Sequence, residues 1–516
     1  MKQESQLYYE DLTKRGIIRL ADKDMVTVWI KPDCCNLTSV HLRKIADITE
    51  KYARGYLLFT TNQNAVIPFV NIKDVDEVLA ELETVSLRLD RCGPTVRNIK
   101  VCYDDKICPE AVTSCLSLAN KLENFFDAPF SHKVKIGVAG CDKDCISSRV
   151  LTDIGFVGVE NNGTPQFDVF VGGKLGLKPF AGERMAESLS EDESVKFLRN
   201  YFDYMEKEGK RGERSADLIR RVGLAKVKEE LNKNLQDGLL LQPIESRIDI
   251  KEGATNKTIL RIRATLGQVN ATRLRKIADI AEKYGQGFVH FPIRCAPEIP
   301  CIDPERITDI RQELQEAGLQ ILEDGIDNIQ GCCFGQHCTE NIMDPHPLLL
   351  RIEQRVTQLG LNNQNISISS GGCPNSCGFP QISDIGFYGA VEPAVDIPKC
   401  NGCELCVPVC RVRAITMQDG LAVIDLNACR DCGQCIMACP FDAIVEKRKG
   451  FTVLVGGREG KDIRFGEKIA EFLSEEETFQ LTDNCLTLLR EKNTTAASLV
   501  DEVGIENFKE MLFSVK

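Results

Sequence analysis

The sequence predicts a duplicated protein of mixed helices and strands, in the α/β or α+β class, with a cysteine-rich module inserted into its second copy. Three observations support this prediction. Two segments recur in the same order, each copy alternates helical and extended patterns, and regularly spaced cysteines interrupt the second copy. At 516 residues, the chain is expected to form three or four domains of about 100–200 residues each.

The duplication rests on two pairs of similar segments. Residues 42–70 return at 274–302, and residues 167–198 return at 451–481. The constant order indicates a tandem duplication of about 230 residues, lengthened by the insertion in the second copy.

Each repeat opens with a pattern typical of a helix followed by a strand. Apolar or small residues recur at helical spacing at Leu42, Ile45, Ala46 and Thr49, and again at Leu274, Ile277, Ala278 and Ala281. Gly55 and Gly287 follow these stretches and are expected to be C-caps. The apolar runs 56–59 and 288–291 then predict buried strands.

The second recurring segment carries a glycine pair in each copy. Gly172-Gly173 and Gly456-Gly457 come directly after β-rich runs and predict turns. We expect the helices that follow these turns to begin near Ala181 and Gly466. All of these elements are expected to serve core packing.

Composition narrows the class of protein. The net charge of −12 argues against nucleic acid or an anionic membrane as the main partner. The N-terminus is too polar for a signal peptide, and no apolar run approaches the ~18 residues of a membrane span, so a cytoplasmic protein without membrane insertion is expected. Most of the twenty-four cysteines stand in short, regular spacings, which indicates metal ligation rather than disulfides in that compartment.

The insertion, residues 391–447, contains two cysteine runs with the spacing of two-cluster ferredoxins. In that arrangement the fourth cysteine of each run ligates the other cluster. Zinc and disulfides are the alternatives, and the paired runs favour clusters over both. The prediction therefore assigns one cluster to Cys400, Cys403, Cys406 and Cys439, and the other to Cys429, Cys432, Cys435 and Cys410. Arg411 replaces the proline that usually follows the last cysteine of such a run.

Each repeat also contains a C-x5-C pair followed by a C-x3-C pair, a spacing unlike zinc ribbons or ferredoxins. The sequence DIGF follows the second pair in both copies. The first copy has Cys102, Cys108, Cys141 and Cys145, and the second has Cys332, Cys338, Cys373 and Cys377.

These features resemble the siroheme-containing sulfite and nitrite reductase family over nearly the whole chain. The ferredoxin insertion is similar to the dissimilatory branch of that family. The resemblance implies α+β halves packed about a pseudo-twofold axis with siroheme between them. It also implies that the second-copy quartet holds the catalytic [4Fe–4S] cluster, that Cys377 bridges it to siroheme, and that the chain holds up to four clusters.

Three basic residues stand where the family places ligands for its anionic substrate. Arg97 lies five residues before Cys102, and Lys133 and Lys135 lie on one face of an expected strand because they are two residues apart. A small oxyanion needs fixed cations and proton donors in a water-poor pocket. The alternative, a solvated surface Lys-x-Lys, is less favoured beside these cysteines. Their second-copy counterparts are Asp327, Asn365 and Ser367, so no symmetric anion site is expected.

One motif departs from the family pattern. The family's Thr-Thr-Arg-Gln is Thr60-Thr61-Asn62-Gln63 in this chain, and Asn62 can donate a hydrogen bond but carries no charge. Arg294 occupies the corresponding place in the second copy. By resemblance, Asn62 belongs to the substrate site, whereas Thr60, Thr61, Gln63, Arg294 and Cys377 contact the cofactor.

The expected domains are a first repeat at 1–240, the start of the second repeat at 241–390, the ferredoxin module at 391–447, and the end of the second repeat at 448–516. The expected reaction is reduction of sulfite to sulfide, with electrons from a ferredoxin or similar protein. Nitrite, another sulfur or selenium oxyanion, and a non-catalytic electron-transfer subunit are the alternatives. An oligomer is compatible with the sequence.

Overall fold

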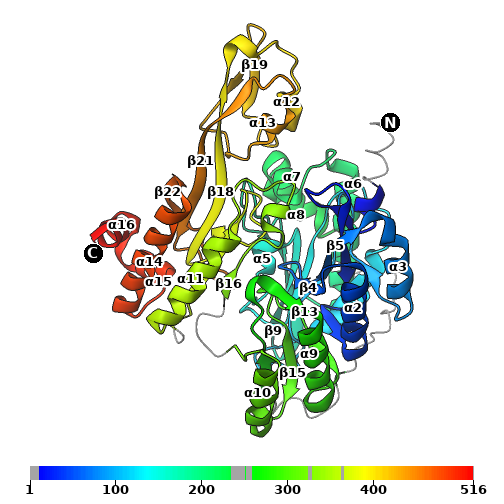
Figure 1. The fold of residues 1–516 in the computed structure, drawn as a ribbon. Coiled ribbons are helices and arrows are strands. Elements are labelled where there is room, and N and C mark those ends of the chain that lie inside the picture. The colour runs from blue at the N-terminus through cyan, green and yellow to red at the C-terminus, as the bar shows by residue number, and fades with distance from the viewer. Residues whose placement is uncertain (1–10, 234–249, 251–257, 323–327, 362–364, 515–516) are drawn as a thin grey trace. The chain divides into compact units, whose positions relative to one another are not determined.

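The computed structural model describes the whole chain except residues 1–10, 234–249, 251–257, 323–327, 362–364 and 515–516 (Figure 1). It contains two compact units. Unit 1 comprises Met1–Lys174, Pro179–Leu322 and Gly460–Asp462, and unit 2 comprises Leu175–Lys178, Glu323–Glu459 and Ile463–Lys516. Among the described residues, no helix is both long and apolar enough to cross a membrane.

Unit 1 begins with two small sheets that share strands between the two repeats. The first sheet has the order β1 (Ile17–Arg19), β2 (Met25–Lys31), β5 (Ala65–Asn71), β4 (Tyr56–Phe59), β13 (Gln268–Asn270), with β6 (Arg88–Leu89) also paired to β2. The second has the order β12 (Thr258–Arg261), β15 (Glu298–Ile302), β14 (Phe288–His290), β3 (Asn36–Thr38). Each sheet therefore takes its last strand from the other repeat.

This exchange is reciprocal at the level of single hydrogen bonds. The amide of Ala271 donates to the carbonyl of Gly55 over 2.9 Å, and the amide of Ser39 donates to the carbonyl of Gly287 over 2.8 Å. The duplicated segments thus face each other through equivalent atoms, as a duplicated α+β fold requires.

The two repeated helices, α2 (Ser39–Tyr52) and α9 (Ala271–Tyr284), pack against one another in the same reciprocal way. Arg43 of α2 forms ion pairs with acidic residues of α9, and Arg275 of α9 forms them with acidic residues of α2. The eight residues that predicted these helices are all buried, so the periodicity was interpreted correctly.

The rest of unit 1 is a five-stranded sheet flanked by helices. Its order is β11 (Glu183–Leu189), β10 (Thr164–Val171), β9 (Ile154–Asn161), β8 (Ile136–Ala139), β7 (Lys100–Val101). The helices of this region are α4 (Cys115–Leu122), α5 (Ser148–Leu151), α6 (Glu191–Glu208), α7 (Ser215–Val222) and α8 (Leu224–Leu231), whereas α3 (Val75–Glu83) and α10 (Ile307–Glu316) pack into the core of the first two sheets. β7, β8 and β9 are parallel neighbours, so the segments before β7 and β8 meet at one edge.

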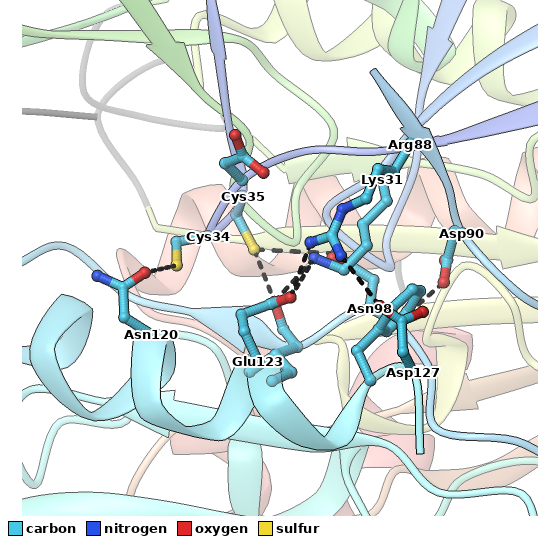
Figure 2. A network of polar contacts seen from close by, with 12 residues as sticks. Lys31, Cys34, Cys35, Arg88, Asp90, Asn98, Asn120, Glu123 and Asp127 are labelled. Carbon is cyan, nitrogen blue, oxygen red and sulfur yellow. Dashed lines mark hydrogen bonds and ion pairs between the residues drawn. The ribbon is translucent and has the colours of Figure 1, made fainter. Parts of the chain in front are cut away.

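A buried ion pair connects the first small sheet to the helices that flank the five-stranded sheet. Lys31, at the end of β2, lies 2.7 Å from Glu123, which directly follows α4, and both side chains are almost fully buried (Figure 2). Arg88 of β6 adds a second cation 3.2 Å from the same carboxylate. Close by, Cys34 donates to Asn120 and Cys35 donates to the carbonyl of Ile99.

Unit 2 is built on a five-stranded sheet with the order β16 (Asn328–Gln330), β17 (Ser367–Gly371), β18 (Ile385–Val395), β21 (Ile444–Val455), β22 (Glu467–Leu473). It is covered by α11 (His346–Leu359), α14 (Glu475–Lys492), α15 (Ala496–Val503) and α16 (Ile505–Ser514). β18 and β21 pair from Ile385↔Val455 out to Val395↔Ile444, and the cysteine-rich module lies at the far end of this long hairpin (Figure 1). The module contains α12 (Cys406–Val409), β19 (Ile415–Gln418), β20 (Leu421–Ile424) and α13 (Gln434–Ala438).

Two local predictions were wrong. The segments after the glycine pairs, where helices near Ala181 and Gly466 were expected, are the strands β11 and β22. The helices begin only at Glu191 and Glu475, where a serine N-cap and a glutamate three residues later form a capping box. The capping box therefore marks the start of each helix, and the weak helical periodicity of the preceding segment does not produce a helix.

The glycines expected as C-caps lie slightly beyond the helix ends. The C-caps are Ala53 and Gly285, and Gly55 and Gly287 follow two residues later at φ of +72° and +78°. Each donates its amide back into the last turn, to the carbonyl of Thr49 or Ala281. Glycine is favoured at these two positions because other residues rarely adopt this left-handed conformation.

Candidate functional site

The basic residues predicted from the sequence are brought together in unit 1 by parallel pairing. Val96 bridges Val134, and the amide of Arg97 donates to the carbonyl of Val134 over 2.9 Å. Arg97 therefore lies beside the segment that carries Lys133 and Lys135 on either side of Val134.

Arg97 is buried, and Lys133 and Lys135 beside it are partly buried. Burial, reinforced by the charges of Lys135, Arg97 and Arg214, lowers the pKa of Lys133 to about 7. Arg97 is only 6% exposed, and its Nε has no hydrogen-bond partner among the described residues. Arg214 differs because it forms an ion pair with Asp153, with Nε 2.5 Å from the carboxylate. A cluster of partly buried cations of this kind is suited to an anion.

Asn62 is part of this cluster. Lys135 Nζ donates to Asn62 Oδ1 over 3.0 Å. The amide of Asn62 donates to Thr60 Oγ1 over 3.1 Å, and its carbonyl accepts from Asn98 Nδ2 at 3.1 Å. The Thr60–Gln63 turn and the cationic strand edge thus meet at the position where the family has an arginine.

Gln63 and Thr61 hold this turn in place through backbone contacts. Gln63 is fully buried, and its Nε2 donates to the carbonyls of Val101 at 3.0 Å and Phe291 at 2.7 Å. Its Oε1 accepts from the amide of Val101 at 3.1 Å. The carbonyl of Thr61 accepts from Lys100 Nζ at 2.8 Å. Both side-chain amide atoms of Gln63 are therefore used by the protein itself.

Lys100 and Asn98 are site residues that the sequence reasoning missed. Lys100 is completely buried, and burial together with the charge of Lys135 holds its pKa well below the usual range. The available signal was their place in the segment between Arg97 and Cys102, where Asn98 and Lys100 alternate with apolar residues. Arg294 is half-buried in the turn after β14, and the neighbouring Cys295 lies close enough to Lys100 to sense its charge.

The first-copy cysteine quartet assembles in unit 1. The thiol of Cys102 hydrogen-bonds that of Cys145, which with burial raises the pKa of Cys102. Cys141 lies near both Cys145 and Cys108. A fifth thiol, Cys115, is buried within reach of Cys141 and Cys108 at the start of α4. The equivalent position, seven residues after Cys338, is Pro345, the N-cap residue of α11, so only the four predicted positions are cysteines in both copies.

The second-copy quartet assembles in unit 2. Burial, with Cys377, Cys338 and Cys332 nearby, raises the pKa of the Cys373 thiol above its ordinary value. The amide of Gly372 points at Cys332 Sγ over 3.3 Å, the kind of N–H···S contact that also tunes cluster potentials. Cys377 is the exposed member of the quartet.

The ferredoxin module groups its cysteines as the sequence predicted them. Cys406 has Cys403, Cys400 and Cys439 as neighbours, and the four line one small pocket. Cys432 lies near Cys410, and Cys435 lies near Cys432 and Cys429. The fourth cysteine of each run is thus next to the other run, as the ligation pattern requires.

These groups fit [4Fe–4S] clusters and an acidic tetrapyrrole. Within the described ranges, no three His, Cys, Asp or Glu side chains converge on a point that could hold one metal ion. A [4Fe–4S] cubane needs four thiolates at separate corners, and each quartet gathers four cysteines. For siroheme, which carries carboxylates, the fitting observation is the buried Arg97 Nε without a partner in the described chain.

Comparison with known proteins agrees with this assignment. The model of the "Nitrite and sulphite reductase 4Fe-4S domain" matches residues 92–238 and 323–515, and that of the "Nitrite/Sulfite reductase ferredoxin-like half domain" matches 18–85 and 251–317. Both domain types thus occur twice, which confirms the duplication.

Individual relatives are similar at lower identity. The chain is 30% identical over 269 residues to the coenzyme F420-dependent sulfite reductase of Methanocaldococcus jannaschii, covering 51% of this chain and 43% of that protein. It is 25% identical to sulfite reductase (ferredoxin) 1 of Mycolicibacterium paratuberculosis, over 70% of this chain and 69% of that protein. It is 23% identical to the chloroplastic ferredoxin–nitrite reductase of Spinacia oleracea, over 72% and 67%.

A solved structure supports the fold. The NirA protein of Mycobacterium tuberculosis superposes with a TM-score of 0.73 at 19% identity, covering 97% of this chain and 90% of that one. The predicted oxidoreductase class and cofactors are confirmed at the level of the family. The chain belongs to the nitrite and sulfite reductase family, whose cofactors are siroheme and [4Fe–4S] clusters.

Proposed function

We propose that the chain reduces a small oxyanion at siroheme coupled to the Cys377 cluster, and that sulfite, reduced to sulfide by six electrons, is its substrate. The proposal takes its substrate from relatives named as sulfite reductases. It takes its electron source, a ferredoxin or similar protein, from a relative named with ferredoxin and from the module at 391–447.

The observation that carries the proposal is the group of neighbouring cations formed by buried Arg97 and partly buried Lys133 and Lys135. Three cationic side chains side by side repel one another, and burial makes each charge more costly. A bound anion compensates both costs. The pKa of Lys133 near 7 shows how strongly its charged form is disfavoured without one.

Each of these residues has a definable task. Arg97 and Lys135 hold the anion by charge-assisted hydrogen bonds, which are stronger than neutral ones. Lys133, whose pKa lies near neutral pH, can both donate a proton to a substrate oxygen and be reprotonated. When bound, siroheme and its cluster supply the electrons. Asn62, in the Thr60–Gln63 turn, fixes the position of the Lys135 ammonium by accepting a hydrogen bond from it.

Nitrite is the second candidate, and Asn62 is the observation that favours it. With asparagine in place of the family's arginine, the pocket has one cation fewer, and Lys135 is partly engaged by the amide oxygen. A less highly charged anion needs less compensation. This charge argument does not separate selenite from sulfite, because the two anions carry similar charge. Only their shapes distinguish them.

Activity of anaerobically purified protein with a reduced dye as donor tests the proposal. Turnover of sulfite ahead of nitrite and selenite is expected, together with the absorption bands of siroheme. Lys135→Ala should abolish turnover and leave the absorption spectrum intact. Cluster absorption without siroheme bands would instead favour a non-catalytic electron carrier. A Lys135→Ala protein that still reduces sulfite and nitrite at the normal rate would reject the role of the cations.

A further inference from the structure

The duplication allows one cluster loop to be compared with its equivalent inside the same molecule. In the first copy, Glu110 stands two residues after Cys108 and forms an ion pair with Lys143, 3.0 Å away. In the second copy, Glu340 stands two residues after Cys338, and the position of Lys143 is taken by Asn375. The glutamate has been kept, whereas its cation has been lost from the loop.

The ferredoxin module supplies what the second-copy loop lacks. Glu340 Oε2 accepts from Gln434 Nε2 at 2.7 Å and from Asn375 Nδ2 at 3.4 Å. The guanidinium of Arg411 lies 3.8 Å from the same carboxylate, and its Nη1 donates to Asn375 Oδ1 over 3.3 Å. Arg411 is the residue that replaces the usual proline after Cys410. All of these contacts lie within unit 2.

These four residues adjoin two cluster sites at once. Gln434 lies between Cys432 and Cys435, and Arg411 directly follows Cys410, so both belong to the loops of one ferredoxin quartet. Asn375 lies between Cys373 and Cys377. Arg411 is also near enough to Cys432 for its charge to act on that thiol. A backbone contact also connects the module to β18, where Val391 forms a β-bridge with Cys432.

Stability alone does not explain this arrangement. The side chain of Arg411 is 56% exposed and that of Glu340 is 32% exposed, and exposed ion pairs contribute little to folding. Their common feature is position, since they connect the loops of two redox centres that must exchange electrons if the module serves the Cys377 site. Electron tunnelling weakens steeply with distance, so fixing this contact has a direct effect on rate.

We propose that Glu340, Asn375, Arg411 and Gln434 form the electron-transfer junction between the ferredoxin quartet of Cys410, Cys429, Cys432 and Cys435 and the catalytic quartet ending at Cys377. The inference deepens the proposed function and rests on it. Arg411 and Gln434 act as positioning residues that dock the module on Glu340. Arg411 takes the place that Lys143 has in the first copy.

The step that crosses the junction is a one-electron transfer. The donating ferredoxin cluster passes from the 1+ to the 2+ state, and the accepting Cys377 cluster passes from 2+ to 1+. A one-electron reductant, either a ferredoxin-type protein or a photoreduced deazaflavin, restores the donor cluster.

The test uses the anaerobically purified full-length protein without oxyanion. A light pulse on deazaflavin injects less than one electron per molecule, and freeze-quenched EPR spectra follow its movement to the Cys377 cluster. Glu340→Ala should slow the redistribution about tenfold, because losing a charge-assisted hydrogen bond lowers the ratio of docked to undocked module by about that factor, and only the docked module transfers electrons at the full rate. Glu110→Ala, the matched change in the first copy, should leave this rate unchanged.

A second measurement separates positioning from folding. Arg411→Gln should shift the reduction potential of the adjacent ferredoxin cluster to a more negative value, because a nearby cation favours the reduced cluster. Arg411→Lys should retain the potential, and Arg411→Pro should behave like Arg411→Gln. If Glu340→Ala does not incorporate its clusters, the reduction potentials of the three Arg411 variants decide whether Arg411 acts at the proposed junction.

Unchanged redistribution in Glu340→Ala with full cluster content would overturn the junction, as would identical potentials in Arg411→Gln and Arg411→Lys. Normal redistribution in the wild type without reduction of sulfite or nitrite would reject the proposed function and leave the junction standing.

Discussion

Lys135 Nζ donates a hydrogen bond to Asn62 Oδ1 over 3.0 Å, so the residue that departs from the family motif is in direct contact with a predicted substrate ligand. The departure therefore changes the pocket in two ways. It removes one positive charge, and it occupies one of the three donors of the lysine ammonium.

Asn62→Arg is expected to strengthen oxyanion binding. The added guanidinium provides a charge-assisted hydrogen bond worth about 1.5–3 kcal/mol, or roughly a tenfold lower Kd or more. Sulfite, which carries more charge than nitrite, should gain more. Spectroscopic titration of each anion measures both effects. Asn62→Gln is the control, because it keeps an amide and adds no charge; equal gains for Gln and Arg would contradict the charge argument.

The pH dependence of anion binding provides the second prediction. The free protein holds Lys133 with a pKa of about 7, below the ordinary lysine value because of burial and neighbouring cations. An anion beside the ammonium raises that pKa. Binding above pH 7 therefore takes up a proton, and the affinity should fall up to about tenfold per pH unit as pH rises. Below pH 7 the lysine is already charged, and the affinity should level off.

Nitrite is the appropriate ligand for this measurement, because it stays a monoanion across the range. Lys133→Met should bind nitrite more weakly at pH 6 and show a flat profile from pH 7 to 9. A wild-type affinity that does not change between pH 7 and 9 would show that Lys133 does not titrate there.

Much of the fold could be predicted from the sequence because its signals are local or repeated. The helices at Leu42 and Leu274 follow from periodicity, and the ferredoxin cysteines follow from spacing alone. The strands after Gly173 and Gly457 were not recognised, because the segments that form β11 and β22 were interpreted as helix starts, whereas each pairs with the strand just before it, β10 or β21. Only the capping boxes at Ser190 and Ser474 marked the true helix starts.

Some residues of the candidate site could be predicted from the sequence, and others could not. Arg97, Lys133 and Lys135 were named because they stand where the family places its anion ligands, and their roles stay predictions. The docking role of Glu340 could not be predicted, because its partners Gln434 and Arg411 lie about 70–95 residues away and meet it only through the β18–β21 hairpin.

The buried ion pair between Lys31 and Glu123 gives a prediction of stability. Glu123→Gln leaves the ammonium of Lys31 buried without its counter-charge and should lower the free energy of unfolding by about 3–5 kcal/mol. Chemical denaturation followed by circular dichroism measures the loss. The double variant Lys31→Met/Glu123→Leu removes both charges and should recover most of it. A double variant as unstable as Glu123→Gln would indicate that the network in Figure 2 contributes through shape rather than charge.

The first-copy quartet makes the last prediction, which concerns metal content. If Cys102, Cys108, Cys141 and Cys145 hold a cluster, Cys145→Ser should lower the iron of the purified protein by about four atoms per chain, one cubane. The matched control is Cys115→Ala, since Cys115 is buried beside the same thiols but has no cysteine counterpart in the second copy. Iron and acid-labile sulfide should remain at the wild-type level in that variant. Loss of a cluster from Cys115→Ala with retention in Cys145→Ser would reassign the fourth ligand to the start of α4, and equal iron in all three proteins would remove the first-copy cluster altogether.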